Sequence, residues 1–318
     1  MDRTPRILPS VVLLVLALAG TACQANRLVA PAVSMPPPPP SAYSRAVIVI
    51  SVDGLRPDAI ATYRAATMSR LQAEGSYSLS AQTIVPSKTL PSHTSMVTGE
   101  LPSEHGVLWN NAFTHRSGTL AIPTIFSEAR AGGYRTAAFF SKTKFRHLQQ
   151  PGALDYSQAP GGWFGLWSAD RTARDVETYL ASHAPHLLFV HLADVDTAGH
   201  RHQWMSPRYG QAVVTADAAV ARILAAAERA YGNGLFTVIL TADHGGHGRD
   251  HGSAEATDTT IPWIAWGRGV VAGQLPDRTV TTVDTAATVL YLLGLDRPAG
   301  WAGTAVVAAF DRASTRVP

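Results

Sequence analysis

The chain has 318 residues, a formal net charge of +3 and a single cysteine. One cysteine cannot form an internal disulfide, so the folded part must be stabilised by its core alone. The basic residues are scattered without a run of five or six like charges. This pattern indicates an ordinary solvated surface that weakly attracts anions, and specific nucleic-acid binding is not expected.

The N-terminus has the order of a secretory signal. Arg3 and Arg6 precede an apolar run over residues 7–20, and two small residues follow it. The run is shorter than the roughly 20 apolar residues that cross a membrane. We therefore predict a signal peptide over residues 1–23 and an exported protein.

Cys23 stands where a bacterial lipoprotein carries its lipidated cysteine. The sequence predicts a periplasmic or cell-envelope location, either with a lipid anchor at Cys23 or as a soluble exported form. Five consecutive prolines, Pro36 to Pro40, predict an extended linker over residues 24–44. Residues 45–318 are expected to form one large domain.

Five short apolar segments of this domain predict buried strands, and amphipathic patterns near residues 209–231 and 283–294 predict helices. The alternation favours an α/β fold with a mainly parallel sheet and helices on both faces. The strand segments are AVIVISVD (46–53), RTAAFFS (135–141), HLLFVHLAD (186–194), LFTVILTADHG (235–245) and IPWIAWG (261–267).

Three of these segments end in acids: Asp53, then Asp194 and Asp196, then Asp243. Strands of a parallel sheet end at one edge, so the carboxylates should gather there. Several carboxylates in one cleft repel each other unless cations hold them.

Histidines accompany two of these acids. In DVDTAGH, Asp196 and His200 are four residues apart, which places them on one face of a helix turn. TADHGGHGRDHG brings three more histidines close to Asp243. This composition is typical of a metal site, although a solvated turn explains either segment alone equally well.

Hydroxyl groups gather in the segment IVPSKTLPSHTSMVTGELPSEHGV, at Ser87, Thr89, Ser92 and Thr94. A hydroxyl needs a base or a metal to become a nucleophile, and no serine lies in a G-x-S-x-G turn. From composition alone, a loop that caps a helix starting near Ser92 is the simpler interpretation.

Together these motifs resemble the alkaline phosphatase superfamily, and most closely its nucleotide pyrophosphatase/phosphodiesterase branch, the type I phosphodiesterases. The resemblance rests on VISVDGLRPD, PSKTLPSHTSMVTGELPSEHGV, DVDTAGH, TADHGGHG, IPWIAWGRGV and VDTAATVLYLLGLDRPAGWAG, and it spans residues 47–303. It implies an alkaline-phosphatase-like sheet with a small or absent cap.

The resemblance also implies a site with two divalent metal ions, most often Zn²⁺, and Thr89 as the nucleophile. One metal would be held by Asp53, Thr89, Asp243 and His244, and the other by Asp196, His200 and His251. Asn110 would hydrogen-bond a phosphoryl oxygen together with the Thr89 N–H, with Asn111 as the alternative.

Several side chains stay open between two interpretations. His247 competes with His251 as a ligand, while His93 and His105 are expected to support loop structure. Lys88 either steers the anionic substrate or faces solvent. Leu90 follows Thr89 where the branch often has an aromatic residue, so nucleotide specificity does not follow. Three aromatic side chains either line a substrate pocket or pack on the sheet edge: Trp163, Phe164 and Trp167.

The resulting hypothesis is metal-dependent hydrolysis of phosphodiester or pyrophosphate bonds in a small phosphorylated substrate, through a phospho-threonine intermediate. A phosphate monoesterase or phosphonate hydrolase with the same metals is the alternative, and the lack of an arginine placed near Thr89 favours diesters. A non-catalytic envelope protein is a third interpretation, against which the complete ligand set argues. A sulfatase is not expected, because the only cysteine is in the signal region.

Overall fold

All five apolar segments form strands, because their alternating side chains can be buried on both faces of one sheet. Every residue of β1 (Val47–Val52), β5 (Leu187–Leu192) and β6 (Thr237–Thr241) is buried. Continuous apolar runs of this kind are typical of parallel strands covered on both faces. β3 (Thr136–Phe139) and β7 (Thr260–Gly267) are the other two predicted strands.

The sheet has eight strands in the order β4-β3-β5-β1-β6-β7-β2-β8. β7 pairs antiparallel with both of its neighbours, whereas the other pairs are parallel. The sequence did not predict β2 (Ser76–Gln82), β4 (Tyr156–Gln158) and β8 (Gly273–Gln274). β2 lacks an apolar run and places serines at buried positions, so its composition is that of a loop.

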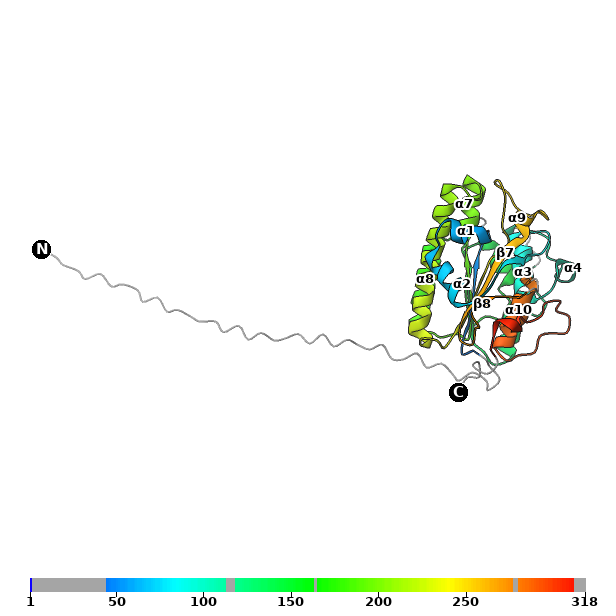
Figure 1. The fold of residues 1–318 in the computed structure, drawn as a ribbon. Coiled ribbons are helices and arrows are strands. Elements are labelled where there is room, and N and C mark those ends of the chain that lie inside the picture. Colours follow the sequence, from blue (N-terminus) through cyan, green and yellow to red (C-terminus); the bar gives the residue numbers. More distant parts are fainter. Residues whose placement is uncertain (2–43, 113–117, 163–164, 277–279, 312–318) are drawn as a thin grey trace. The chain divides into compact units, whose positions relative to one another are not determined.

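Helices cover both faces of the sheet, and Figure 1 shows α1, α2, α7 and α8 on one side of it and α3 and α10 on the other. The predicted α/β fold class is therefore confirmed. The helices are α1 (Pro57–Thr62), α2 (Ala66–Glu74), α3 (Thr89–Thr98), α4 (Pro102–His105), α5 (Ile125–Ala131), α6 (Ala169–Leu180), α7 (Asp194–His202), α8 (Pro207–Tyr231), α9 (Ala256–Thr259) and α10 (Thr282–Leu292), with 3-10 turns η2 (Thr143–Leu148) and η3 (Val307–Ala309).

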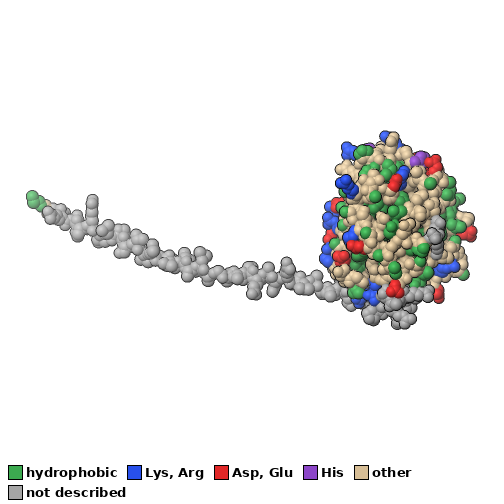
Figure 2. All heavy atoms as spheres, viewed as in Figure 1, with side chains coloured by type: hydrophobic (Ala, Val, Ile, Leu, Met, Phe, Trp, Pro, Cys, Tyr) green, Lys and Arg blue, Asp and Glu red, His purple; other side chains and the backbone are tan. Residues whose placement is uncertain are grey.

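This computed structural model describes residues 1, 44–112, 118–162, 165–276 and 280–311. The described residues from Ser44 onward belong to one compact unit. The predicted signal peptide beyond Met1, Cys23, the linker up to residue 43, Trp163 and Phe164 lie outside the described residues. Charges of both signs are interspersed on the face that Figure 2 shows.

α8 is long and apolar enough to cross a membrane by length and composition alone. Its buried positions, among them Val213, Val220 and Ile223, repeat at helical spacing, and the helix packs against α6 and α7. This one-sided burial is typical of a core helix.

Gly54 fixes how closely the loop after β1 approaches α7. Its φ of +73° lies in the left-handed region, and a Cβ at this position would lie 2.9 Å from Asp196 Cα. Trp204 Nε1 and the Tyr209 hydroxyl both donate to the Gly54 carbonyl, each at 2.9 Å. A side chain here would push the loop and α7 apart.

We expect Gly54→Ala to lower the melting temperature more than Gly234→Ala. Both glycines have positive φ, so each substitution costs about 1–2 kcal/mol of backbone strain. Only Gly54 adds a clash, because nothing lies within 4 Å of a Cβ at Gly234. Thermal unfolding of the two variants measures the difference, and equal losses would contradict the close approach at Gly54.

Candidate metal and phosphoryl-transfer site

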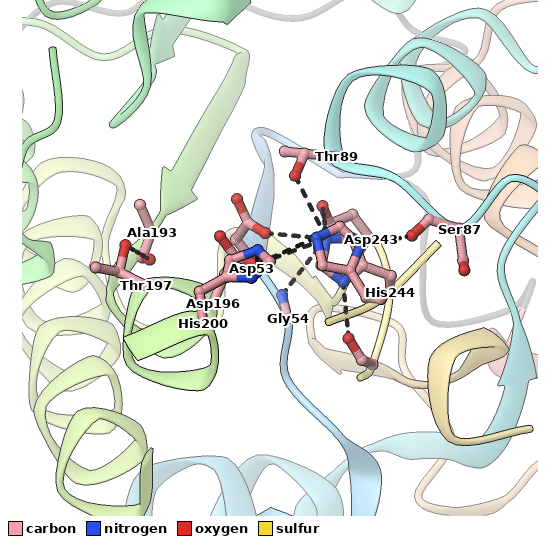
Figure 3. A network of polar contacts seen from close by, with 12 residues as sticks. Asp53, Gly54, Ser87, Thr89, Ala193, Asp196, Thr197, His200, Asp243 and His244 are labelled. Carbon is pink, nitrogen blue, oxygen red and sulfur yellow. Dashed lines mark hydrogen bonds and ion pairs between the residues drawn. The ribbon is translucent and has the colours of Figure 1, made fainter. Parts of the chain in front are cut away.

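The strand order brings four charged side chains together at one edge of the sheet. They follow the adjacent strands β3, β5, β1 and β6 and are, in that order, Lys142, Asp196, Asp53 and Asp243. Figure 3 shows Asp53, Asp243 and His244 beside Asp196 and His200, with Thr89 close to His244. Asp53 and Asp243 are fully buried, and Asp196 is 4% exposed.

The acids and histidines form two groups. Within each group, the ligand atoms lie within 4.8 Å of one another. One group is Asp53, Asp243 and His244, and the other is Asp196, His200 and His251. His200 lies one turn after Asp196 on α7, with its Nε2 3.3 Å from Asp196 Oδ1. Apart from Thr89, these are the two ligand sets that the resemblance implies.

In each of the three carboxylates, one oxygen is held by neighbouring groups, and the other faces the site without a hydrogen bond from the described residues. Asp53 Oδ2 accepts from His191 and Lys142, Asp196 Oδ2 accepts from Lys142, and Asp243 Oδ1 accepts from the Gly54 N–H. The three buried oxygens without a hydrogen bond are Asp53 Oδ1, Asp196 Oδ1 and Asp243 Oδ2. Burying a carboxylate oxygen without a partner is unfavourable unless a cation binds it. This donor set therefore fits divalent metal ions.

The three histidines are oriented in the same way. Each ring contacts a backbone carbonyl through Nδ1: His244 that of Gly245, His251 that of Ser87 and His200 that of Arg249, at 2.8–2.9 Å. A carbonyl only accepts, so Nδ1 of each ring carries a proton and Nε2 is the ring atom that faces the carboxylates. A metal ion would therefore bind these rings through Nε2.

Burial and the neighbouring charges shift the pKa values of Asp243 and His244. Burial, together with the charge of Asp53, raises the pKa of Asp243 to about 8. Burial opposes the charge on His244, but Asp243 and Asp53 raise its pKa to about 9. A bound cation would offset the burial of these carboxylates and favour their ionised forms.

Thr89 is the first residue of α3, so the helix begins three residues before the predicted start at Ser92. The side chain is 1% exposed, and its Oγ1 lies 3.4 Å from His244 Nε2. One turn later, His93 Nδ1 contacts the Thr89 carbonyl at 2.8 Å. The hydroxyl therefore lies at the positive end of a helix dipole, next to the first metal group.

Asn110 contacts the first turn of α3. Its Oδ1 accepts from the Leu90 N–H at 2.9 Å and from Lys144 Nζ at 3.0 Å. The Leu90 side chain is 1% exposed and packs in the core, so Leu90 faces the site through its backbone. Lys88 precedes Thr89 as the N-cap, and its methylenes lie against Gly252.

The structure separates His247 from the site. Its Nδ1 lies 2.7 Å from Asp258 Oδ1, whereas His251 Nε2 lies 3.6 Å from Asp196 Oδ1. Asp194 is also turned away, because its Oδ2 accepts from the Ala169 N–H at the start of α6. His105 contacts Ser95 Oγ at 2.9 Å and accepts from the Val107 N–H.

Trp167, the described member of the predicted aromatic set, borders a cavity of about 380 Å³ that Asp194, Arg201 and Arg208 also line. The Arg171 guanidinium lies 4.2 Å from the centre of its ring. The ring therefore faces a hollow beside α7 and is partly covered.

Sequence reasoning missed Lys142 and His191. Lys142 Nζ lies 2.6 Å from Asp53 Oδ2 and 2.5 Å from Asp196 Oδ2. Burial opposes its charge, yet Asp196 and Asp53 raise its pKa. Lys142 follows β3 at the edge where the acids gather, so the strand-end rule applied to cations would have found it. His191 interrupts an apolar strand, which was a weaker signal.

Residues 47–253 match the family model of the Type I phosphodiesterase / nucleotide pyrophosphatase family. The chain belongs to this family. Curated relatives include GPI ethanolamine phosphate transferase 1 of Homo sapiens, 27% identical over 267 residues, and that of Gibberella zeae, 26% identical over 278 residues. Each alignment covers 74% of this chain and 27% of the relative, so the chain spans about a quarter of the length of these proteins.

Solved structures share the fold at low identity. Murine ectonucleotide pyrophosphatase/phosphodiesterase 5, as an inactive Thr→Ala variant in complex with AMP, superposes with a TM-score of 0.67 at 15% identity, covering 80% of this chain and 96% of that one. A protein of the alkaline phosphatase superfamily from Vibrio parahaemolyticus gives a TM-score of 0.62 at 16% identity, covering 87% and 74%. The predicted alkaline-phosphatase-like fold is thereby confirmed.

The relatives correct the predicted location. They are fungal and mammalian proteins named GPI ethanolamine phosphate transferase 1, so the predicted bacterial periplasmic or lipoprotein location is wrong. That prediction depended on reading the apolar run before Cys23 as a bacterial signal. The charge and hydropathy of an N-terminal segment do not distinguish a bacterial export signal from a eukaryotic one.

We expect His251→Ala to lower the bound divalent metal from about two ions per chain to about one, because it removes an Nε2 donor from the Asp196 group. Elemental analysis of the purified full chain measures the metal. His247→Ala should retain the metal, and His183→Ala, which alters an exposed ring stacked on Tyr179, serves as control. Metal loss in His247→Ala with none in His251→Ala would reverse the two roles.

Proposed function

We propose that the chain cleaves phosphodiester or pyrophosphate bonds with Thr89 as the nucleophile, at a site that holds two divalent metal ions. The observation that carries the proposal is the position of the Thr89 hydroxyl, which is buried at the N-terminus of α3 and lies 3.4 Å from His244 Nε2. That nitrogen lies 3.3 Å from both Asp53 Oδ1 and Asp243 Oδ2. No histidine is needed as a general base, because a cation can activate the hydroxyl.

Asp53, Asp243, His244 and Thr89 would hold one ion, and Asp196, His200 and His251 the other. Mixed nitrogen and oxygen donors suit Zn²⁺ best among common divalent ions. When bound, the ions supply positive charge that lowers the pKa of the Thr89 hydroxyl and stabilises the departing oxygen.

The protein groups have separate tasks in the proposed reaction. Thr89 Oγ1 attacks phosphorus and forms a covalent phospho-threonine, while the bond from phosphorus to the first ester oxygen breaks. The N-terminal end of α3 faces the negative charge that develops on the phosphoryl oxygens, and Asn110 holds its first turn through the Leu90 N–H. Water then attacks phosphorus, and the Thr89 hydroxyl is restored.

Transfer to an alcohol instead of water is the second candidate, and the names of the curated relatives favour it. Both reactions share the first step at Thr89 and differ only in the acceptor. The inactive Thr→Ala variant of the murine relative supports a threonine-dependent reaction in either case.

Thr89→Ala should lower the turnover of bis(4-nitrophenyl) phosphate by about 1,000-fold or more, because the nucleophile is lost. Thr94→Ala is the matched control, since that hydroxyl bonds the Leu90 carbonyl within α3. Unchanged turnover in Thr89→Ala, with full metal content, would contradict the proposal.

The same assay separates hydrolysis from transfer. With a primary alcohol such as ethanolamine added, hydrolysis should release the phosphate monoester alone, and transfer should give a new diester of the added alcohol. Phosphorus NMR of the products distinguishes the two, and a dominant new diester would replace hydrolysis by transfer.

A further inference from the structure

The loop over residues 247–253 shapes the second metal group, that of Asp196. It carries the ligand His251. The carbonyl of Arg249, also in this loop, lies 2.9 Å from Nδ1 of His200. Two of the three side chains in the second metal group therefore depend on the conformation of this loop.

The Asp258 carboxylate, in the short helix α9, holds this loop at both ends. At the start of the loop, His247 Nδ1 lies 2.7 Å from Asp258 Oδ1. At its end, Ser253 donates twice to Asp258 Oδ2, from the backbone N–H at 3.0 Å and from the hydroxyl at 2.8 Å. One carboxylate thus closes the stretch of chain that includes His251.

The end of the loop that Asp258 holds also contacts the segment before the nucleophile. The Ser87 hydroxyl donates to the Ser253 carbonyl at 2.7 Å, and the Ser87 carbonyl lies 2.8 Å from His251 Nδ1. A shift of Ser253 would therefore disturb Ser87, the residue that orients the His251 ring. Groups that orient a ligand in this way influence how tightly its metal is bound.

Asp258 differs from the carboxylates that face the metal site. It is fully buried, and both of its oxygens have hydrogen-bonding partners. Each of the three site carboxylates has instead one oxygen without a partner among the described residues. Burial opposes the charge of Asp258, yet the hydrogen bonds from His247 and Ser253 lower its pKa. Asp258 is therefore an ionised group that holds the loop, with no oxygen left over for a metal ion.

The first metal group lies outside this loop. Asp53 and Asp243 come within two residues of the ends of β1 and β6, and His244 is oriented by the Gly245 carbonyl. The Gly245 N–H donates to the backbone carbonyl of Asp258 at 2.8 Å. A change of the Asp258 side chain leaves that backbone bond in place, so it acts on the second group alone.

We propose that Asp258 is a positioning residue that sets the affinity of the second metal group for its ion and leaves that of the first group unchanged. The two ions therefore have separately controlled affinities, and the loop over residues 247–253 decides whether the second is bound. The inference rests on the proposed two-metal site, and it gives Asp258 no contact with the substrate.

The test titrates the metal-free full chain with zinc in competition with a chromophoric chelator. Asp258→Asn keeps the size of the side chain and removes its charge. It should weaken binding of the second ion by about 10- to 100-fold, as is usual for groups that orient metal ligands, and leave the first ion unchanged. His251→Ala identifies the second ion in the titration, because it removes a ligand of that group.

Two further variants each remove one of the three hydrogen bonds to Asp258. Ser253→Ala removes the hydroxyl bond and His247→Ala the imidazole bond. Each should weaken the second ion by about 2- to 10-fold, as expected for one hydrogen bond. This loss is small enough to leave the ion bound in the purified chain.

Asp217→Asn is the matched control for lost stability. Asp217 is also a buried carboxylate, and it accepts the backbone N–H groups of Thr67 and Met68 at the start of α2. The substitution should lower the melting temperature and change neither zinc affinity. A loss of second-ion affinity in Asp217→Asn as large as that in Asp258→Asn would overturn the inference.

The remaining outcomes separate this inference from the proposed function. Equal weakening of both ions in Asp258→Asn, or an unchanged second ion, would overturn the inference alone. If Asp258→Asn does not fold, Ser253→Ala decides, and an unchanged second ion there would overturn it. A wild type that binds fewer than two ions would overturn the two-metal site and this inference together. Full turnover in Thr89→Ala would overturn the proposed nucleophile, and the zinc titration would still decide the role of Asp258.

Discussion

The burial of three carboxylates at one sheet edge is the constraint on which the rest of the site depends. Asp53, Asp196 and Asp243 are almost fully removed from water, and burial together with the charge of Asp53 raises the pKa of Asp243. Charge in this position is unfavourable unless it is paired. Lys142 pairs with one oxygen of Asp53 and one of Asp196, while the inward-facing oxygens have no hydrogen bond from the protein. A cation bound at this edge would offset the cost of burying these charges and so stabilise the folded state.

Backbone groups hold the histidines and Asp243 of the site in defined orientations. Carbonyls of Gly245, Ser87 and Arg249 contact the Nδ1 atoms of the three histidines, and the Gly54 N–H holds Asp243. These partners come from loops at the ends of different strands, so the sheet order determines the site. The close contact between Gly54 and Asp196 brings the loop after β1 against α7, and thereby connects the two metal groups.

Much of this could be predicted from the sequence, because buried parallel strands are continuous apolar runs and their ends carry the acids. β2 could not be found in this way, because it has no apolar run and its serines are typical of a loop. Lys142 was missed because the strand-end rule was applied only to acids, and the start of α3 was misplaced because Ser92 resembles a cap more than Thr89 does. The resemblance already assigned the ligand role to His251, and the fold adds the contact of His247 with Asp258.

Lys142 and Lys144 show how two residues of the same type can have different surroundings. They have the same side chain and lie on one short segment, yet two carboxylates raise the pKa of the first and burial lowers that of the second. The first acts on the acids and keeps their free oxygens directed inward. The second donates a hydrogen bond to the neutral Asn110 amide beside the nucleophile. A motif comparison centred on Thr89 does not reveal this difference, because both lysines lie more than fifty positions after Thr89 in the sequence.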